Sequence, residues 1–164
     1  MTRGGLAALF TLGGAAILLL ATNGEGATLI VPNTVIAWRD LANKYAQIYG
    51  ILDPEEILAV IWNESTGNPN GSNPGDPSWG LMGVEPLIAR AYGGFATGDD
   101  SWKTDPDKNV KAGAGFLADL KNKYSSDPNW IAAYNEGETQ YNRGTPDQNY
   151  VDRFYAHLNA LKGA

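Results

Sequence analysis

The 164-residue sequence contains no cysteine and a single histidine, His157. The lack of cysteine excludes a disulfide framework, a thiol nucleophile and a cysteine-ligated zinc site. Zinc hydrolases usually use two or three histidine ligands, so one histidine also argues against a metal site. No Gly-x-Ser-x-Gly motif accompanies His157, which lies in a helical pattern near the C-terminus. We therefore interpret His157 as a surface or packing residue and expect neither a metal nor a cofactor.

Positive charge is also scarce, with 12 Lys and Arg against 18 Asp and Glu, for a formal net charge of -6. Such a chain has little with which to neutralise phosphates, which argues against a nucleic-acid partner. With 43% hydrophobic and 18% charged residues, the composition is that of a globular protein. The length suits one domain with a single core. Carboxylates remain as the best candidates for chemistry.

Charge is missing altogether from residues 6–22, an apolar run that follows Arg3. The run is slightly shorter than the roughly 20 residues that span a bilayer as a helix. It also has the features of a signal peptide, but no clear cleavage site of small residues follows it. We predict an N-terminal hydrophobic helix in residues 1–26, as a membrane anchor in preference to a cleaved signal, followed by one domain in residues 27–164. Arg3 would keep the N-terminus in the cytoplasm and place that domain on the periplasmic or cell-wall side.

The remainder of the sequence is typical of a mainly α domain. Periodic apolar positions and capping residues predict helices over residues 33–49, 53–64, 80–92, 107–124, 130–135 and 145–161. Pro86 is expected to distort the third of these helices. Residues 67–78 are rich in Asn, Gly and Pro and predict a long loop, with β-structure limited to a small hairpin within residues 68–78.

Glu64 is the most informative carboxylate, since it ends an apolar helical run. It shares a helix face with Ile57, Val60 and Ile61, so it is expected to point toward the core side. Partial desolvation and the negative end of the helix dipole would both raise the pKa of such a carboxyl group. A carboxylic acid of this kind can protonate a leaving oxygen near neutral pH. An exposed Glu at a frayed helix end, or one that caps nearby backbone, is the alternative.

A glycine-rich segment and several aromatic residues could form a polysaccharide groove near Glu64. The glycine-rich residues 79–83 would let a sugar chain approach the backbone closely. Aromatic faces that could stack on sugar rings are Trp62, Trp79, Tyr134 and Tyr141. Core packing is the alternative for each of them, and we favour it for Trp62 and for Trp130.

The sequence resembles the lytic transglycosylases of the soluble-type (SLT), goose-lysozyme-like superfamily. Three segments carry this resemblance in the family's order: Glu64 to Pro69, Ser78 to Met82, and Ala132 to Gly137. They are similar to the family's Glu-Ser motif with a nearby Asn-Pro, its Ser-x-Gly-Leu-Met-Gln segment and its Ala-Tyr-Asn-x-Gly motif. The stretch from Asp105 to Leu117 also resembles the one that precedes the last motif. The resemblance covers about residues 54–158 and implies a lysozyme-like fold.

The resemblance implies that Glu64 is a single catalytic acid and base acting on peptidoglycan glycan strands. Glu64 would protonate the oxygen between N-acetylmuramic acid and N-acetylglucosamine, then deprotonate the muramic acid C6 hydroxyl, which attacks the anomeric carbon. The product would be a 1,6-anhydro sugar, and the enzyme would open the wall locally. Tyr134 matches a family Tyr that hydrogen-bonds near the catalytic Glu. The groove positions that the resemblance assigns to sugar contact are Ser78, Trp79, Met82, Tyr134 and Asn135.

One residue departs from the family pattern, because Gly83 stands where Gln is usual. Glycine offers only its backbone, which puts the groove's sugar contacts in question more than the chemistry.

Two other functions fit the same residues. A goose-type muramidase would hydrolyse the same bond with a second carboxylate as base, for which Asp76 is a better candidate than Glu85 or Glu136. Asp76 before Pro77 is also a common way to open a turn, and we favour that interpretation. A non-catalytic peptidoglycan-binding or virion structural protein could keep the fold, although the presence of Glu64 and Tyr134 argues against it. Both a bacterial envelope enzyme and a phage-encoded, virion-associated one fit a small domain behind an N-terminal anchor.

Overall fold

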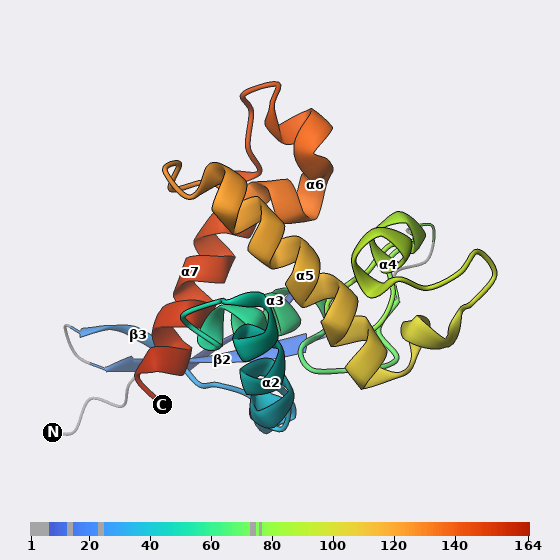
Figure 1. Cartoon of the computed structure of the whole chain (residues 1–164). Coiled ribbons are helices and arrows are strands. Elements are labelled where there is room, and N and C mark those ends of the chain that lie inside the picture. Colours follow the sequence, from blue (N-terminus) through green and yellow to red (C-terminus); the bar gives the residue numbers. More distant parts are fainter. Residues whose placement is uncertain (1–6, 13–14, 23–24, 73–74, 76) are drawn as a thin grey trace, which may run out of the picture.

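The computed structural model describes residues 7–12, 15–22, 25–72, 75 and 77–164. From residue 33 onward the chain is mainly helical, as predicted (Figure 1). The helical elements are α1 (Asn33–Ile36), α2 (Arg39–Tyr49), α3 (Glu55–Ser65), α4 (Pro86–Gly93), the 3-10 helix η1 (Ser101–Lys103), α5 (Pro106–Tyr124), α6 (Ala132–Tyr141) and α7 (Gln148–Lys162).

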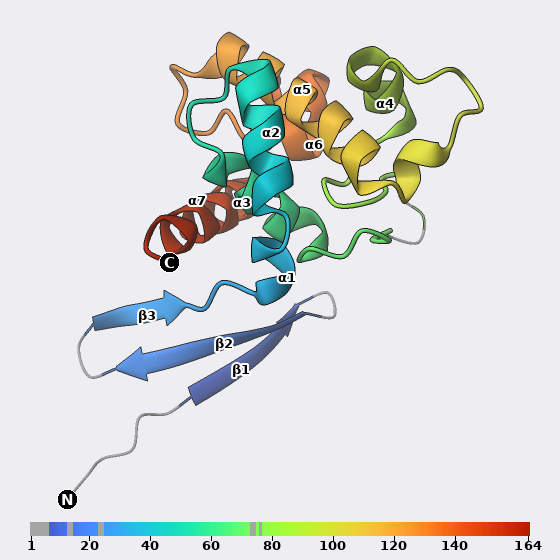
Figure 2. The ribbon, with the colours of Figure 1, turned by 60° about the horizontal axis from the view of Figure 1, so that its bottom comes forward.

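The described part of the N-terminal apolar run, residues 7–12 and 15–22, forms strands and not the helix that its hydropathy predicted. The strands are β1 (Ala7–Leu12), β2 (Ala15–Thr22) and β3 (Glu25–Leu29), which pair antiparallel in that order. Leu12 is opposite Ala15, and the sequence between them is Gly-Gly. Each glycine disfavours a helix by about 1 kcal/mol, whereas Gly-Gly suits a two-residue hairpin connection. Figure 2 shows the sheet as a layer beside the helical body. Within the described residues, no helix is both long enough and apolar enough to cross a membrane.

Helix α3 is the centre of the core. Residues 57–61 are each 0% exposed, because this helix is apolar on all its faces. It packs against α2 and α7 (Figure 1). Each fully buried aliphatic side chain contributes about 1.5–3 kcal/mol. The core therefore fixes the position of the C-terminal end of α3, where Glu64 lies.

Helix α5 crosses the body and packs against α4, η1, α2 and α6 (Figure 1). Its start is well defined, since the Asp105 side chain accepts hydrogen bonds from the backbone N–H groups of Asp107 and Lys108. Pro106 occupies the first turn, where a missing N–H costs nothing. Through these contacts α5 connects the helices on either side of the site described below.

Several predicted helix boundaries differ from those in the structure. The helix predicted over residues 80–92 begins at Pro86, since residues 79–84 form a tight turn with Gly80 and Gly83 at positive φ. The helix predicted over residues 33–49 is divided into α1 and α2. Helix α6 starts two residues later than predicted and continues past Gly137, which breaks the helical geometry at φ 74°. In the described part of residues 68–78, the predicted hairpin amounts to a bridge from Ser72 to Trp79.

Candidate active site

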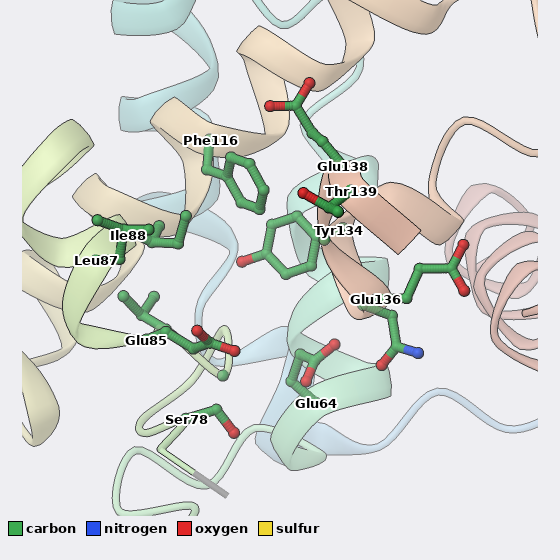
Figure 3. A pocket seen from close by; sticks show the side chains of 14 residues that line it. Glu64, Ser78, Glu85, Leu87, Ile88, Phe116, Tyr134, Glu136, Glu138 and Thr139 are labelled. Atoms are coloured by element: carbon green, nitrogen blue, oxygen red, sulfur yellow. The ribbon is translucent and has the colours of Figure 1, made fainter. Parts of the chain in front are cut away.

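A cleft of about 470 Å³ opens at the C-terminal end of α3. Figure 3 shows its walls, with Glu64 from α3, Leu87 and Ile88 from α4, and Phe116 from α5. The described residues that line it are Glu64, Ser78, Gly83, Val84, Glu85, Leu87, Ile88, Phe116, Tyr134, Asn135, Glu136, Gly137, Glu138 and Thr139. The cleft therefore combines apolar and aromatic surface with several carboxylates.

Glu64 lies in the last turn of α3, and Tyr150 of α7 holds its carboxyl group. The Tyr150 hydroxyl donates a hydrogen bond of 2.5 Å to Glu64 Oε1. Burial, the negative charge of Glu64 and this hydrogen bond together raise the pKa of the Tyr150 phenol well above its usual value. Tyr150 therefore stays protonated and remains a donor. Since α7 packs against α3, the bond orients the carboxyl group within a rigid frame.

The residues that end α3 are fixed from outside the helix. Thr66 closes the helix in the left-handed conformation, with φ 53°. Its carbonyl accepts a hydrogen bond of 2.8 Å from Thr34 Oγ1, and the next carbonyl, that of Gly67, accepts one of 2.9 Å from Trp38 Nε1. A non-glycine residue in this conformation is uncommon and is kept where its surroundings require it. The loop that follows Glu64 is thus tied to α1 and to the turn before α2.

Tyr134 lines the cleft, and its hydroxyl donates a hydrogen bond of 2.9 Å to the backbone oxygen of Met82. Burial and then the charge of Glu64 raise the pKa of this phenol well above its usual value. Tyr134 consequently remains protonated as well. Its hydroxyl thereby contacts the 79–84 turn within reach of the charge of Glu64.

Asn109 of α5 determines the shape of the 79–84 turn. This side chain is 1% exposed, and its Oδ1 accepts a hydrogen bond of 2.9 Å from the Met82 N–H. Its Nδ2 donates to the carbonyls of Trp79, at 2.8 Å, and Trp102, at 3.1 Å. A Cβ atom on Gly80 would lie 2.3 Å from Nδ2, so only glycine fits against this side chain. The amide thus makes hydrogen bonds to three backbone groups at once, two of them in buried positions.

The predicted sugar-contact residues divide into two sets. Ser78, Tyr134 and Asn135 line the cleft together with Glu64. Met82 and Trp79 do not: the Met82 side chain is 0% exposed within the core, and Lys103 lies over the Trp79 ring. The turn explains this difference, since it directs these two side chains toward α5 and η1. Asp76 lies outside the described residues.

Among the proposed stacking aromatics, Tyr134 is the one that reaches the cleft, where it packs near Phe116. Trp62, Trp130 and Tyr141 are all buried, at 4%, 6% and 7% exposure. All three belong to the core, which was the favoured interpretation for Trp62 and Trp130.

His157 is a packing residue. It is 5% exposed, and its ring stacks on Trp62 with centroids 4.0 Å apart and planes within 5°. Burial and the positive charge of Arg153 lower the pKa of His157 to about 4, so it is neutral near pH 7.

Carboxylates dominate the charge of the cleft. Glu85, Glu136 and Glu138 line it with Glu64, and none of the described lining residues is basic (Figure 3). Glu138 pairs with Lys123 and accepts a hydrogen bond from Tyr124, and these contacts lower its pKa. Glu136 Oε2 accepts from the backbone N–H of Asp147 at 3.2 Å. Within the described part of the chain, no group of three His, Cys, Asp or Glu side chains could hold a metal ion.

Sequence reasoning did not identify Tyr150 or Asn109 as site residues. Tyr150 lies 86 residues after Glu64 and occurs in an apolar helical stripe, where an aromatic residue is typical of core packing. Asn109 occurs in a helix pattern directly after Lys108, where a polar residue is typical of a solvated helix face. A polar side chain on the buried face of an apolar helix is the signal that could have identified Asn109, since such groups need hydrogen-bond partners.

Residues 40–153 match the family described as transglycosylase SLT domain, which is more than half of the chain, so the chain belongs to this family. The motif resemblance in the sequence is thereby confirmed. The transglycosylase of Enterobacteria phage PRD1 is 30% identical over 112 residues, which cover 68% of this chain and 40% of that protein. Membrane-bound lytic murein transglycosylase C of Edwardsiella ictaluri is 33% identical over 90 residues, covering 52% of this chain and 24% of that protein. The chain thus spans less than half the length of either relative.

The fold is shared with a solved structure of lytic transglycosylase Slt from Pseudomonas aeruginosa, determined as an inactive mutant. The TM-score is 0.63 with 21% sequence identity, over 75% of this chain and 23% of the other. This likeness confirms the mainly α, lysozyme-like architecture of the domain.

Proposed function

We propose that this chain is a peptidoglycan lytic transglycosylase in which Glu64 is the single acid and base. The observation that carries the proposal is the position of Glu64 on the cleft, with one carboxyl oxygen held by the buried Tyr150 hydroxyl. The names of the transglycosylase relatives support the same substrate and reaction.

The proposed reaction needs one carboxyl group and no water. Glu64 donates its proton to the glycosidic oxygen as the bond from C1 of N-acetylmuramic acid to O4 of N-acetylglucosamine breaks. The resulting carboxylate accepts the proton of the C6 hydroxyl as O6 bonds to C1, which closes the 1,6-anhydro ring. Glu64 ends protonated, as it began. Tyr150 keeps the carboxyl group oriented through both steps, and this orientation is a large part of what a positioned group contributes to rate.

Substrate contacts are proposed for the residues that share the cleft with Glu64. Ser78 and Asn135 offer polar groups, and the half-buried ring of Tyr134 offers an apolar face for a sugar ring. The resemblance also assigned Trp79 and Met82 to the groove. These two residues would contribute by holding the 79–84 turn in place, and not by touching the sugar.

Product analysis tests this proposal. Purified peptidoglycan is digested with the full chain, and the fragments are examined by mass spectrometry for 1,6-anhydro-muramic ends. We expect anhydro ends with the wild-type chain and none with the Glu64→Gln variant. Wall-lytic activity in the Glu64→Gln variant would remove Glu64 from the mechanism.

A muramidase that hydrolyses the same bond is the second candidate function. Three further carboxylates, Glu85, Glu136 and Glu138, line the cleft and could activate a water molecule. Inverting hydrolases hold such a base about 6.5–9.5 Å from the acid. Asp76 stays a candidate from sequence. Digestion in H₂¹⁸O separates the two functions, because hydrolysis puts ¹⁸O into reducing ends, whereas the transglycosylase product contains no oxygen from water.

We also propose that residues 1–26 attach the domain of residues 27–164 to a membrane, on the periplasmic or cell-wall side. The uncharged run of residues 6–22 after Arg3 supports this, as does the name of the membrane-bound relative. The phage relative equally supports a virion-associated enzyme. Carbonate extraction of membranes from expressing cells tests the attachment. Release of the full chain into the soluble fraction would refute it.

A further inference from the structure

Gly83 lies directly against the carboxyl group of Glu64. A Cβ atom on Gly83 would be 2.5 Å from Glu64 Oε2 and 3.1 Å from Cδ, and the first distance is shorter than real Cβ contacts allow. Gly83 also has φ 56°, a conformation that glycine adopts without strain. Both features make glycine the fitting residue at a position where the family pattern has Gln.

The turn that carries Gly83 is held on several sides. Ser65 Oγ donates to the Leu81 carbonyl at 2.8 Å. Asn109 accepts from the Met82 N–H at 2.9 Å, and Tyr134 donates to the Met82 carbonyl at 2.9 Å. Trp79 and Val84 exchange two backbone hydrogen bonds of 2.8 and 2.9 Å across the turn. A side chain at position 83 would therefore meet a turn that resists displacement.

The Glu64 carboxyl group is the part that can move, because it ends a side chain with rotatable bonds. Displacing Oε2 also turns Oε1, which accepts the hydrogen bond from Tyr150. A Cβ atom at position 83 would thus disturb the geometry of Glu64 while leaving the packing of α3 and α7 in place.

We propose that Gly83 is a positioning residue for Glu64. Its missing side chain leaves the space in which Oε2 faces the cleft while Oε1 accepts from Tyr150. This inference rests on the proposed role of Glu64 as acid and base. Where the family pattern supplies a Gln side chain, this chain supplies space for the carboxyl group.

Gly83→Ala adds the Cβ atom and nothing else. Gly83→Asn adds the same atom, but asparagine tolerates positive φ better than alanine, which separates the Cβ contact from backbone strain. Gly94→Ala is the matched control, since Gly94 has φ 73° at the end of α4, has no atom within 4 Å of an added Cβ, and does not line the cleft. Initial rates over a range of soluble glycan-strand concentrations give kcat and KM, and thermal melting reports folding.

We expect Gly83→Ala and Gly83→Asn each to lower kcat by about 100-fold with KM within about threefold of wild type. Gly94→Ala should keep wild-type kcat and should lower the melting temperature about as much as Gly83→Ala does. A Gly83→Asn variant with wild-type kcat would overturn the inference. It would also be overturned if kcat in both Gly83 variants fell only in proportion to the unfolded fraction that thermal melting reports. Glu64→Gln is assayed in parallel: if it is inactive while the Gly83 variants are fully active, the role of Gly83 alone is refuted. Activity in Glu64→Gln would refute the role of Glu64 itself.

Discussion

The hydrogen bond from Tyr150 to Glu64 makes a sharp prediction about the Tyr150→Phe variant. This substitution removes one hydroxyl group and keeps the aromatic ring, which is 2% exposed and packed between α7 and α3. The core keeps its volume, so folding should change little. The donor to Glu64 Oε1 is lost, and the carboxyl group becomes free to adopt other orientations.

The expected loss of activity can be worked from the bond itself. Hydrogen bonds to charged groups contribute about 1.5–3 kcal/mol. If this contribution acts on the oriented carboxyl group in the transition state, kcat falls by about 10- to 150-fold, at 1.36 kcal/mol for each factor of ten. KM should change little, because Tyr150 is absent from the residues that line the cleft.

Steady-state kinetics on soluble glycan strands measures this effect, with thermal melting as the control for folding. Tyr150→Phe kcat within about twofold of wild type would refute the proposed orientation of Glu64. A fall in kcat that follows a loss of fold would show that Tyr150 acts through packing instead.

Three further predictions follow from the packing. The pKa of His157 is lowered to about 4 in the folded chain. Below about pH 6.5 the unfolded chain therefore binds a proton at this histidine, whereas the folded chain stays unprotonated there down to about pH 4. The free energy of unfolding should fall by about 3 kcal/mol between pH 6.5 and 4. Denaturant titrations across this range should show a shallower fall for His157→Phe, and identical pH profiles for variant and wild type would contradict the assignment. Asn109→Ala removes the partner of the Met82 N–H and of the Trp102 carbonyl, whereas the Trp79 carbonyl keeps the Val84 N–H; at about 1–3 kcal/mol for each of the two groups we expect a loss of about 2–6 kcal/mol together with loss of activity. An Asn109→Ala chain with wild-type melting temperature would refute the role of the amide. Met82→Leu should keep stability within about 1.5 kcal/mol and leave KM unchanged, whereas Met82→Ala should cost about 2–5 kcal/mol; a rise in KM for Met82→Leu without loss of stability would place the Met82 side chain in the groove after all.

Local sequence was sufficient for the catalytic helix. The Asp-Pro-Glu-Glu start at residues 53–56 and the apolar residues 57–61 specify a buried helix by themselves, and Glu64 follows from the same periodicity. The order of the family motifs then predicted the fold, which the structural likeness confirms. Ser78, Tyr134 and Asn135 were expected near Glu64 from motif order alone, and the structure brings them to one cleft.

Local pattern failed where glycine and long-range hydrogen bonds compete with helix formation. Residues 80–85 have enough apolar positions to suggest a helix, but they form a turn in which the Asn109 side chain accepts a hydrogen bond from the Met82 N–H. As a consequence, the Met82 side chain points into the core and not into the groove that the resemblance implied. The N-terminal run is likewise as apolar as a membrane-spanning helix, yet its strands β1 and β2 pair antiparallel.

From the sequence alone it follows that a carboxyl group ends a buried apolar helix beside a glycine-rich segment. How that group is held depends on the tertiary structure, because its partners come from distant parts of the chain. Tyr150 reaches Glu64 from α7, 86 residues later, and Gly83 reaches it through a turn shaped from α5. Helical periodicity reports which face of one helix is buried, but it carries no information about which side chain of another helix will lie against that face.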